Sequence, residues 1–137
     1  MSTTQLLEEI QNSVNQVKTD NTKIFPIAAT PGDYVRQGDL YITLLEKIPQ
    51  DVKLDDSPQA QLAPGASKGS RHILDSLDGV KIFKRSSASA LQGPILSLSQ
   101  SRTVTHPEHG DIELFEGGCF EITYQRQHAE ELRRARD

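Results

Sequence analysis

The sequence contains one cysteine, no tryptophan and only 5% aromatic residues. A single cysteine excludes an internal disulfide, so a reducing cytoplasm is the expected compartment. No apolar run approaches the roughly 20 residues that cross a bilayer. The opening MSTTQLLEEIQNS places acids and polar residues where a secretory signal would be basic and then apolar. We therefore expect a cytoplasmic protein with no membrane contact.

The chain also lacks an excess of positive charge, because its 19 acidic residues outnumber its 15 lysines and arginines and the net charge is −4. General nucleic-acid binders need a cationic face that displaces counterions, so nucleic acid is not expected as a partner. With 137 residues, of which 35% are hydrophobic, the chain can build one modest and largely aliphatic core.

The first 22 residues read as a helical extension. Residues 3–18 carry apolar side chains at intervals of three and four, which align in one stripe of an amphipathic α-helix: Leu6, Leu7, Ile10, Val14 and Val17. Residues 19–22 (TDNT) form a polar break. We assign residues 1–22 to this extension and residues 23–137 to a single β-rich domain.

Short strand-like runs follow, separated by Gly, Pro and Asp, with no βαβ alternation. This pattern predicts a small antiparallel barrel or sandwich. The run 40–45 is apolar on both faces and predicts a central strand, preceded by a tight bend or bulge at Gly38-Asp39. Residues 24–28 predict a further strand, and residues 129–136 predict a short terminal helix or a frayed tail.

Two turns predict hairpins. Asp78-Gly79 joins the runs 71–74 and 80–83, and Gly117-Gly118 lies within a hairpin that covers residues 111–125. Alternation in the second hairpin places five side chains in the core: Ile112, Leu114, Phe120, Ile122 and Tyr124. Residues 49–70 lack periodicity and predict a mobile loop.

Three segments resemble a family of small uncharacterised bacterial and phage-type proteins. Arg36–Leu40 (RQGDL) is similar to its RQGD segment, and residues 68–73 (KGSRHI) to its G-H-x-H segment, with Ser70 at the first histidine position. Residues 105–127 resemble its H-x-E-H and subsequent QR pattern. The resemblance implies one fold unit from about Tyr34 onward, with residues 1–33 as an extension. It implies no activity.

Three of the four histidines lie in these segments. His72, His106 and His109, together with Glu108, offer the nitrogen and oxygen ligands that bind Zn²⁺ or another divalent metal. Ser70 removes one candidate ligand, and an H-x-x-H in a loop lacks the fixed geometry of a helix. The alternative is that His106 and His109 cap a tight turn entering the hairpin and bond backbone carbonyls.

Other groups carry weaker signals. Glu108 or Glu121 beside a histidine would suit metal-free acid–base chemistry, although no nucleophile elbow or triad accompanies them. Cys119 reads as a small packed or solvent-facing side chain rather than a nucleophile. Lys81, Lys84 and Arg85 form a basic cluster that either contacts an anion or is simply a solvated face.

Two functions remain open. The first is a non-catalytic interaction or accessory module whose N-terminal helix packs on a protein partner, most simply in a homodimer. The second is a metal-binding β-barrel protein or enzyme built around His72, His106, Glu108 and His109. The distance between His72 and the other two histidines discriminates between them.

Overall fold

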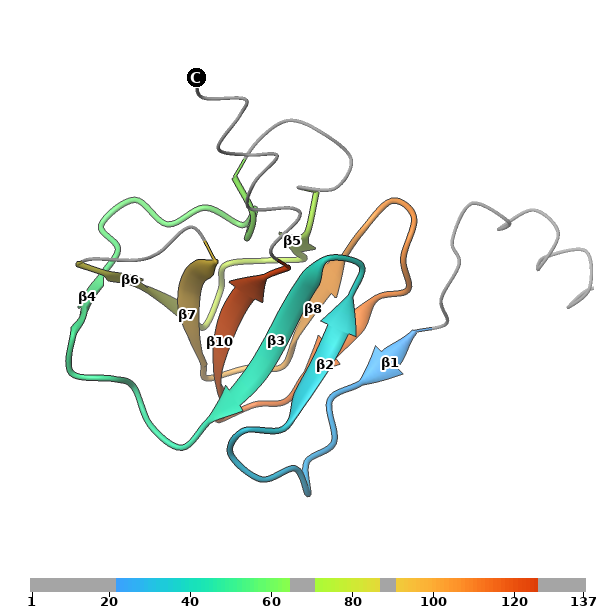
Figure 1. Ribbon diagram of the computed structural model, residues 1–137, viewed down its shortest axis with the longest axis horizontal. Coiled ribbons are helices and arrows are strands. Elements are labelled where there is room, and N and C mark those ends of the chain that lie inside the picture. The colour runs from blue at the N-terminus through green and yellow to red at the C-terminus, as the bar shows by residue number, and fades with distance from the viewer. Residues whose placement is uncertain (1–21, 65–70, 87–90, 126–137) are drawn as a thin grey trace, which may run out of the picture.

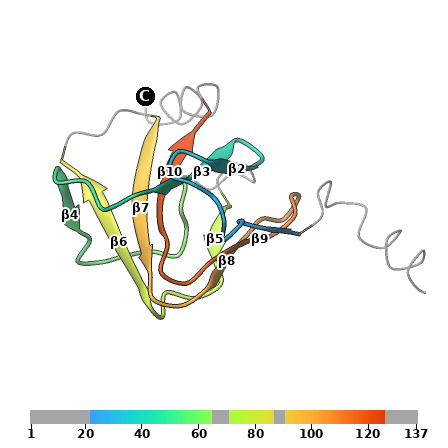
Figure 2. The same cartoon turned by 90° about the horizontal axis from the view of Figure 1, so that it is seen from below.

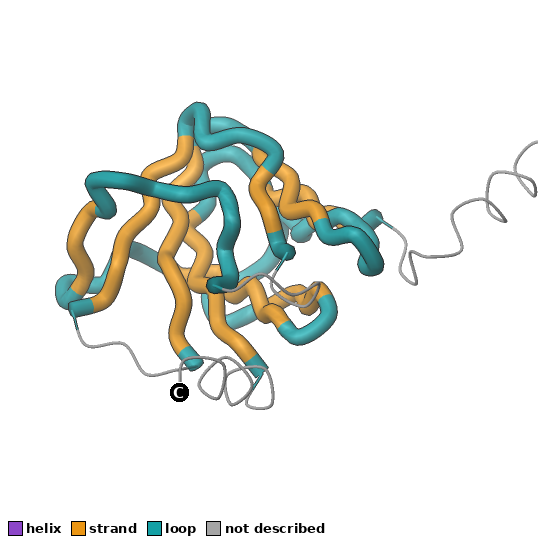
Figure 3. Tube along the Cα trace, turned by 90° about the horizontal axis from the view of Figure 1, so that it is seen from above, coloured by secondary structure: helices purple, strands orange, loops and turns teal. Residues whose placement is uncertain are grey.

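Ten strands and no helix make up the part of the chain that the computed structural model describes, residues 22–64, 71–86 and 91–125 (Figures 1 and 3). The strands form two sheets. The four-stranded sheet has the spatial order β1-β9-β8-β5, with bounds β1 Lys23–Ile24, β5 Ile73–Leu74, β8 Arg102–Thr105 and β9 Ile112–Leu114. The β1–β9 pair is parallel, which departs from the all-antiparallel expectation.

The six-stranded sheet has the spatial order β2-β3-β10-β7-β6-β4. Its bounds are β2 Tyr34–Gln37, β3 Leu40–Leu45, β4 Val52–Leu54, β6 Val80–Arg85, β7 Gln92–Leu98 and β10 Cys119–Tyr124. All pairs in this sheet are antiparallel. The sheet curves over the four-stranded sheet, so that the domain is an open two-sheet structure rather than a closed barrel (Figure 2).

The core lies between the two sheets. Alternate residues of β3 and β10 point inward, and β10 is flanked by β3 and β7. The five side chains predicted for the core in residues 111–125 are all buried, which confirms that part of the prediction. β3 is an inner strand as expected, but only its Leu40, Ile42 and Leu44 face is fully buried.

The predicted hairpin over residues 111–125 is wrong. β9 pairs with β1 and β8 in one sheet, whereas β10 pairs with β3 and β7 in the other. Because both edges of β10 are occupied, β9 has no edge on which to pair. The turn at Gly117, which has φ +85°, instead carries the chain from one sheet to the other. An edge-to-face cluster of Phe25, Phe115 and Phe120 packs beside this crossing.

The predicted hairpin between residues 71–74 and 80–83 is wrong for the same reason. β5 pairs with β8, whereas β6 lies between β7 and β4. Asp78-Gly79 is a turn, with Gly79 at φ +73°, but it joins two sheets. Only Gly38-Asp39 joins neighbouring strands as a tight two-residue turn, between β2 and β3.

The expected loop at 49–70 is partly ordered into the domain. It contains β4, and Gln61 forms a bridge with Ile73. Leu62 and Ala63 are buried in the core, which anchors the segment. The strand expected at 24–28 is also shorter than predicted, because β1 ends at Ile24 and Ala29 N–H closes a turn on Pro26 O.

The helix predicted over 3–18, most of the 1–22 extension and the terminal segment 129–136 lie outside the described residues. Among the described residues, no helix has the length and apolarity needed to span a membrane.

Candidate functional site

Gln37 is the centre of a buried polar cluster that joins the two sheets. It ends β2 and is 1% exposed. Its Nε2 donates to the carbonyl oxygens of Val104 on β8 and of Gly110, both at 2.9 Å. These two bonds fix the orientation of the amide, so that Oε1 accepts from His72 Nδ1 at 2.8 Å. One side chain of the six-stranded sheet thus bonds three groups of the opposite layer.

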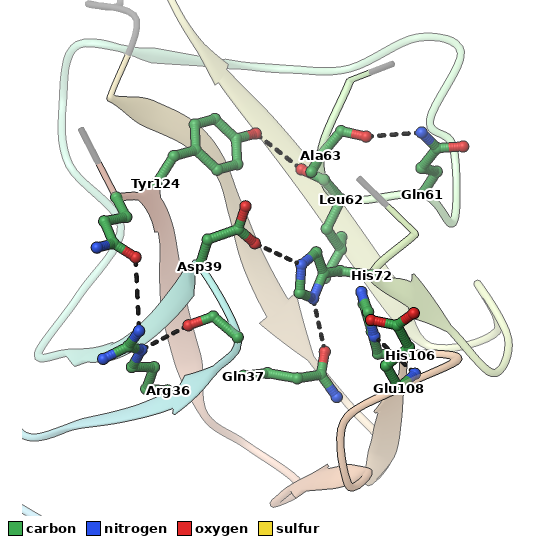
Figure 4. A network of polar contacts seen from close by, with 12 residues as sticks. Arg36, Gln37, Asp39, Gln61, Leu62, Ala63, His72, His106, Glu108 and Tyr124 are labelled. Carbon is green, nitrogen blue, oxygen red and sulfur yellow. Dashed lines mark hydrogen bonds and ion pairs between the residues drawn. The ribbon is translucent and has the colours of Figure 1, made fainter. Parts of the chain in front are cut away.

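His72 continues this network toward Asp39. The imidazole is completely buried, directly before β5, and its Nε2 lies 3.1 Å from Asp39 Oδ1 (Figure 4). Because Gln37 Oε1 can only accept, Nδ1 carries a hydrogen. The other nitrogen, Nε2, faces a carboxylate oxygen of Asp39. Asp39 follows Gly38 in the β2–β3 turn and is about a quarter exposed, so it is the outer end of the network.

The three histidines pack in a row, with His106 between His72 and His109. The His72 and His106 ring centroids are 4.5 Å apart, and those of His106 and His109 are 4.7 Å apart, with interplanar angles near 40°. His106 Nδ1 accepts a 3.0 Å hydrogen bond from the backbone N–H of Glu108. His106 therefore bonds a backbone N–H inside the loop, rather than a backbone carbonyl as the turn-capping alternative expected.

Gly38 makes room for the row of histidines. It has φ +58°, and a Cβ atom there would lie 2.6 Å from His109 Nε2. Arg36 closes the outer side, because its Nε donates to Gly38 O and its Nη2 contacts Gln125 Oε1 at 3.5 Å. The backbone N–H of Gln125 in turn donates to Asp39 O at 2.9 Å. We call these residues the inter-sheet polar cluster: Arg36, Gln37, Gly38, Asp39, His72, His106, His109 and Gln125.

The cluster gathers residues from all three segments that carry the family resemblance. The β2–β3 turn, the start of β5 and the β8–β9 loop meet at the same end of the molecule (Figure 1). Sequence reasoning identified the histidines but missed Gln37 and Asp39 as their partners. One sequence feature pointed to them: Gln37 and Asp39 flank Gly38 in a tight turn between two strand-like runs.

The four predicted metal ligands are therefore close together, but their arrangement is stacked. Both ring nitrogens of His72 already face protein acceptors, and Glu108 contributes its backbone N–H to His106. Within the described ranges, no group of three or more His, Cys, Asp or Glu residues is placed to hold a metal ion. The metal hypothesis for His72, His106, Glu108 and His109 stays a prediction.

The predicted anion contacts lie elsewhere, on β6. Arg85 forms ion pairs with Glu121 and with Asp51, the latter at 3.1 Å, and Lys84 Nζ lies 3.3 Å from Asp55 Oδ1. Lys84 and Arg85 line a groove of about 670 Å³, whereas Lys81 is exposed on the same strand and does not line it. The hydrogen bond to Glu121 is the main cause that raises the pKa of Arg85.

Cys119 is a half-buried free thiol on β10, as the sequence indicated. Burial raises the pKa of Cys119, which lowers the thiolate fraction at neutral pH and disfavours a nucleophilic role. Glu121, a candidate for acid–base chemistry, is instead the ion-pair partner of Arg85.

A third feature is an apolar surface beside β1 and β2. Ile24, Ile27 and Tyr34 are 68%, 82% and 63% exposed, although large apolar side chains are normally covered. Tyr34 lines a groove of about 500 Å³ together with Phe25 and Val35, whereas Ile24 and Ile27 are chain neighbours of its lining residues. We call this surface the β1–β2 apolar edge. The sequence signal was the run from Ile24 to Ala28, which was interpreted as a strand.

These features describe a small β domain of two sheets, which a buried Gln–His–Asp network connects. A family described as a domain of unknown function (DUF8820) matches residues 36–125, and the chain belongs to this family. The match runs from Arg36 to Gln125, the two residues whose side chains meet at the rim of the cluster. No curated protein and no solved structure matches the chain.

Proposed function

We propose that the protein is a non-catalytic interaction module that self-associates through its N-terminal segment. In this proposal, residues 3–18 of one copy pack on the β1–β2 apolar edge of a second copy. The observation that carries it is the exposure of Ile24, Ile27 and Tyr34 on one surface beside a groove, shortly after the predicted helix in the sequence.

Two apolar surfaces in the same chain complement each other. The edge offers three exposed large side chains, and the predicted helix offers a stripe of five, from Leu6 to Val17. A large aliphatic side chain contributes about 1.5–3 kcal/mol when it is fully buried. An isolated helix of this length is marginal in water, so the stripe needs a surface on which to pack.

The connection between the segment and the domain favours an exchange between two copies. Residues 19–22 join the segment to β1, directly beside the apolar edge. Around a two-fold axis, each segment can cross to the partner's edge without a long linker, and the two identical contacts double the interface. The family match begins at Arg36, so β1 and the apolar edge lie outside the matched range.

The inter-sheet polar cluster is consistent with a non-catalytic role, because its polar groups bond one another and connect the two sheets. Gln37 bonds two carbonyl groups of the opposite layer, and His72 bonds Gln37 and Asp39. Such bonds stabilise a buried network only when its members are satisfied together. Its groups are thus committed to holding the sheets in place, and the outward-facing apolar edge supplies the recognition surface.

Light scattering of the full chain over a concentration series tests the proposal. We expect a dimer that dissociates when Ile27→Glu places a charge on the apolar edge, and when residues 2–21 are deleted. Leu54→Glu is the matched control, since Leu54 is a 55% exposed leucine on β4, at the opposite edge of the six-stranded sheet from β2. A full chain that is monomeric at every concentration, or one whose mass falls equally in both glutamate variants, would refute it.

A further inference from the structure

The six-stranded sheet opens between β6 and β7. Their ladder ends at the pair Phe83 and Ile95, and the next residue outward on β7 is Pro94, which has no N–H to continue it. Beyond this point β6 follows β4, through the pair Lys84 and Lys53, whereas β7 follows β10. Among the described residues beyond the Phe83–Ile95 pair, β6 pairs only with β4 and β7 only with β10, so no ladder holds β6 and β7 together there.

The groove of about 670 Å³ occupies this opening. Its floor is apolar and includes Leu62, Ile82, Pro94 and the ring of Tyr124. Tyr124 Oη donates to Leu62 O at 2.8 Å, and burial raises the pKa of Tyr124 to about 12, so the hydroxyl stays neutral. A Cβ atom at Gly93 would lie 2.6 Å from Tyr124 Oη, which keeps this wall free of side chains. The inner part of the groove therefore suits an apolar group.

Both signs of charge line the outer part. Asp55 is held in place, because its Oδ1 accepts from the backbone N–H of Ser57 at 2.9 Å. Lys84 Nζ lies 3.3 Å from the same oxygen, and the Lys84 side chain is 65% exposed. An exposed ion pair of this kind contributes only about 0–1 kcal/mol, so a ligand can separate it at low cost.

Arg85 also lines the groove, but its guanidinium pairs with Glu121 and Asp51, neither of which lines it. One partner, Glu121, is largely buried, whereas the other, Asp51, is mostly exposed and exchangeable. The Nε atom of Arg85 is buried and has no hydrogen-bond acceptor among the described residues. Because this atom has almost no accessible surface, Arg85 acts on the groove through its positive charge and not through a direct contact.

We propose that this groove binds a zwitterionic α-amino acid with an apolar side chain. The ligand carboxylate contacts Lys84, its ammonium takes the place of Lys84 beside Asp55, and its side chain lies on the apolar floor. The exchange replaces one ion pair with two and leaves the net charge of the groove unchanged. A simple anion would leave Asp55 as a repulsive neighbour, and a simple cation would leave Lys84 and Arg85 as repulsive neighbours.

Isothermal titration calorimetry with L-phenylalanine tests the proposal on the full chain. We expect saturable millimolar binding, and binding at least about tenfold weaker for 3-phenylpropionate, which lacks the ammonium, and for phenethylamine, which lacks the carboxylate. A tenfold change corresponds to about 1.4 kcal/mol, the scale of one charge-assisted hydrogen bond.

Single substitutions at Lys84 and Asp55 separate the contributions of the lysine and the carboxylate to ligand binding. Lys84→Ala should weaken phenylalanine binding, whereas Lys81→Ala, an exposed lysine of the same strand outside the groove, should not. Asp55→Asn should weaken phenylalanine and strengthen 3-phenylpropionate, because only the former needs the carboxylate. Absence of saturation, equal affinity of either fragment, or equal losses in the two lysine variants would overturn the proposal.

Discussion

At the scale of one residue, Gly38 allows the inter-sheet polar cluster to pack, because its position tolerates no side chain. Its φ of +58° is a conformation in which an L side chain costs about 1–2 kcal/mol. A Cβ atom would also meet the His109 ring at 2.6 Å, and that ring is held by its stack on His106. The two costs have different origins and can be separated.

We predict that Gly38→Ala lowers the free energy of unfolding by both terms, about 1–2 kcal/mol for the backbone and about 1–3 kcal/mol for overpacking. In a His109→Ala background only the backbone term should remain. Urea unfolding of the four members of this double-mutant cycle measures the coupling. Additive effects would mean that the ring does not hold this position, and they would contradict the described packing.

The sequence predicted correctly which side chains are buried where the prediction depends only on alternation along one strand. Ile112, Leu114, Phe120, Ile122 and Tyr124 are buried as expected, because period-two burial depends only on the strand itself. Gln37 and Asp39 were missed as partners of His72. Their contacts span 35 and 33 positions in the chain, and no local pattern encodes which distant groups a side chain will meet.

At the scale of the elements, strand positions were largely predictable and strand pairing was not. Both predicted hairpins fail because Gly79 and Gly117 turn the chain into the other sheet. A glycine turn between two strand-like runs looks the same whether it joins neighbours or crosses between layers. The pairing is decided by competition for edges, and β10 is occupied by β3 and β7.

β10 is consequently the element on which the larger sheet depends. We predict that Ile122→Ala, in the middle of this strand and fully buried, lowers the free energy of unfolding by about 2–5 kcal/mol. Thr123→Ala, the next residue on the half-exposed face, serves as the control and should cost much less. Chemical denaturation compares the two, and equal costs would contradict the assignment of the inner face.

At the scale of the whole molecule, the family match begins at Arg36, after the apolar edge. The family match covers residues 36–125 and contains the polar cluster and the β6–β7 groove, whereas the apolar edge extends from β1 to the beginning of β2. The helix predicted over residues 3–18, with its stripe of five apolar side chains, precedes that edge in the sequence. We propose that this predicted helix and the apolar edge mediate self-recognition, whereas Phe25, in the same stretch of sequence before the match, packs in the core.

Disulfide trapping tests this central claim most directly. Cys119 is the only cysteine, so a Cys119→Ser background allows one thiol at Val14 in one preparation and one at Ile27 in another. When the Val14→Cys and Ile27→Cys proteins are mixed and oxidised, the account predicts a disulfide that links two different chains. No such species in the mixture, together with an intrachain disulfide in a Val14→Cys/Ile27→Cys double variant, would place the segment on its own domain and contradict the claim.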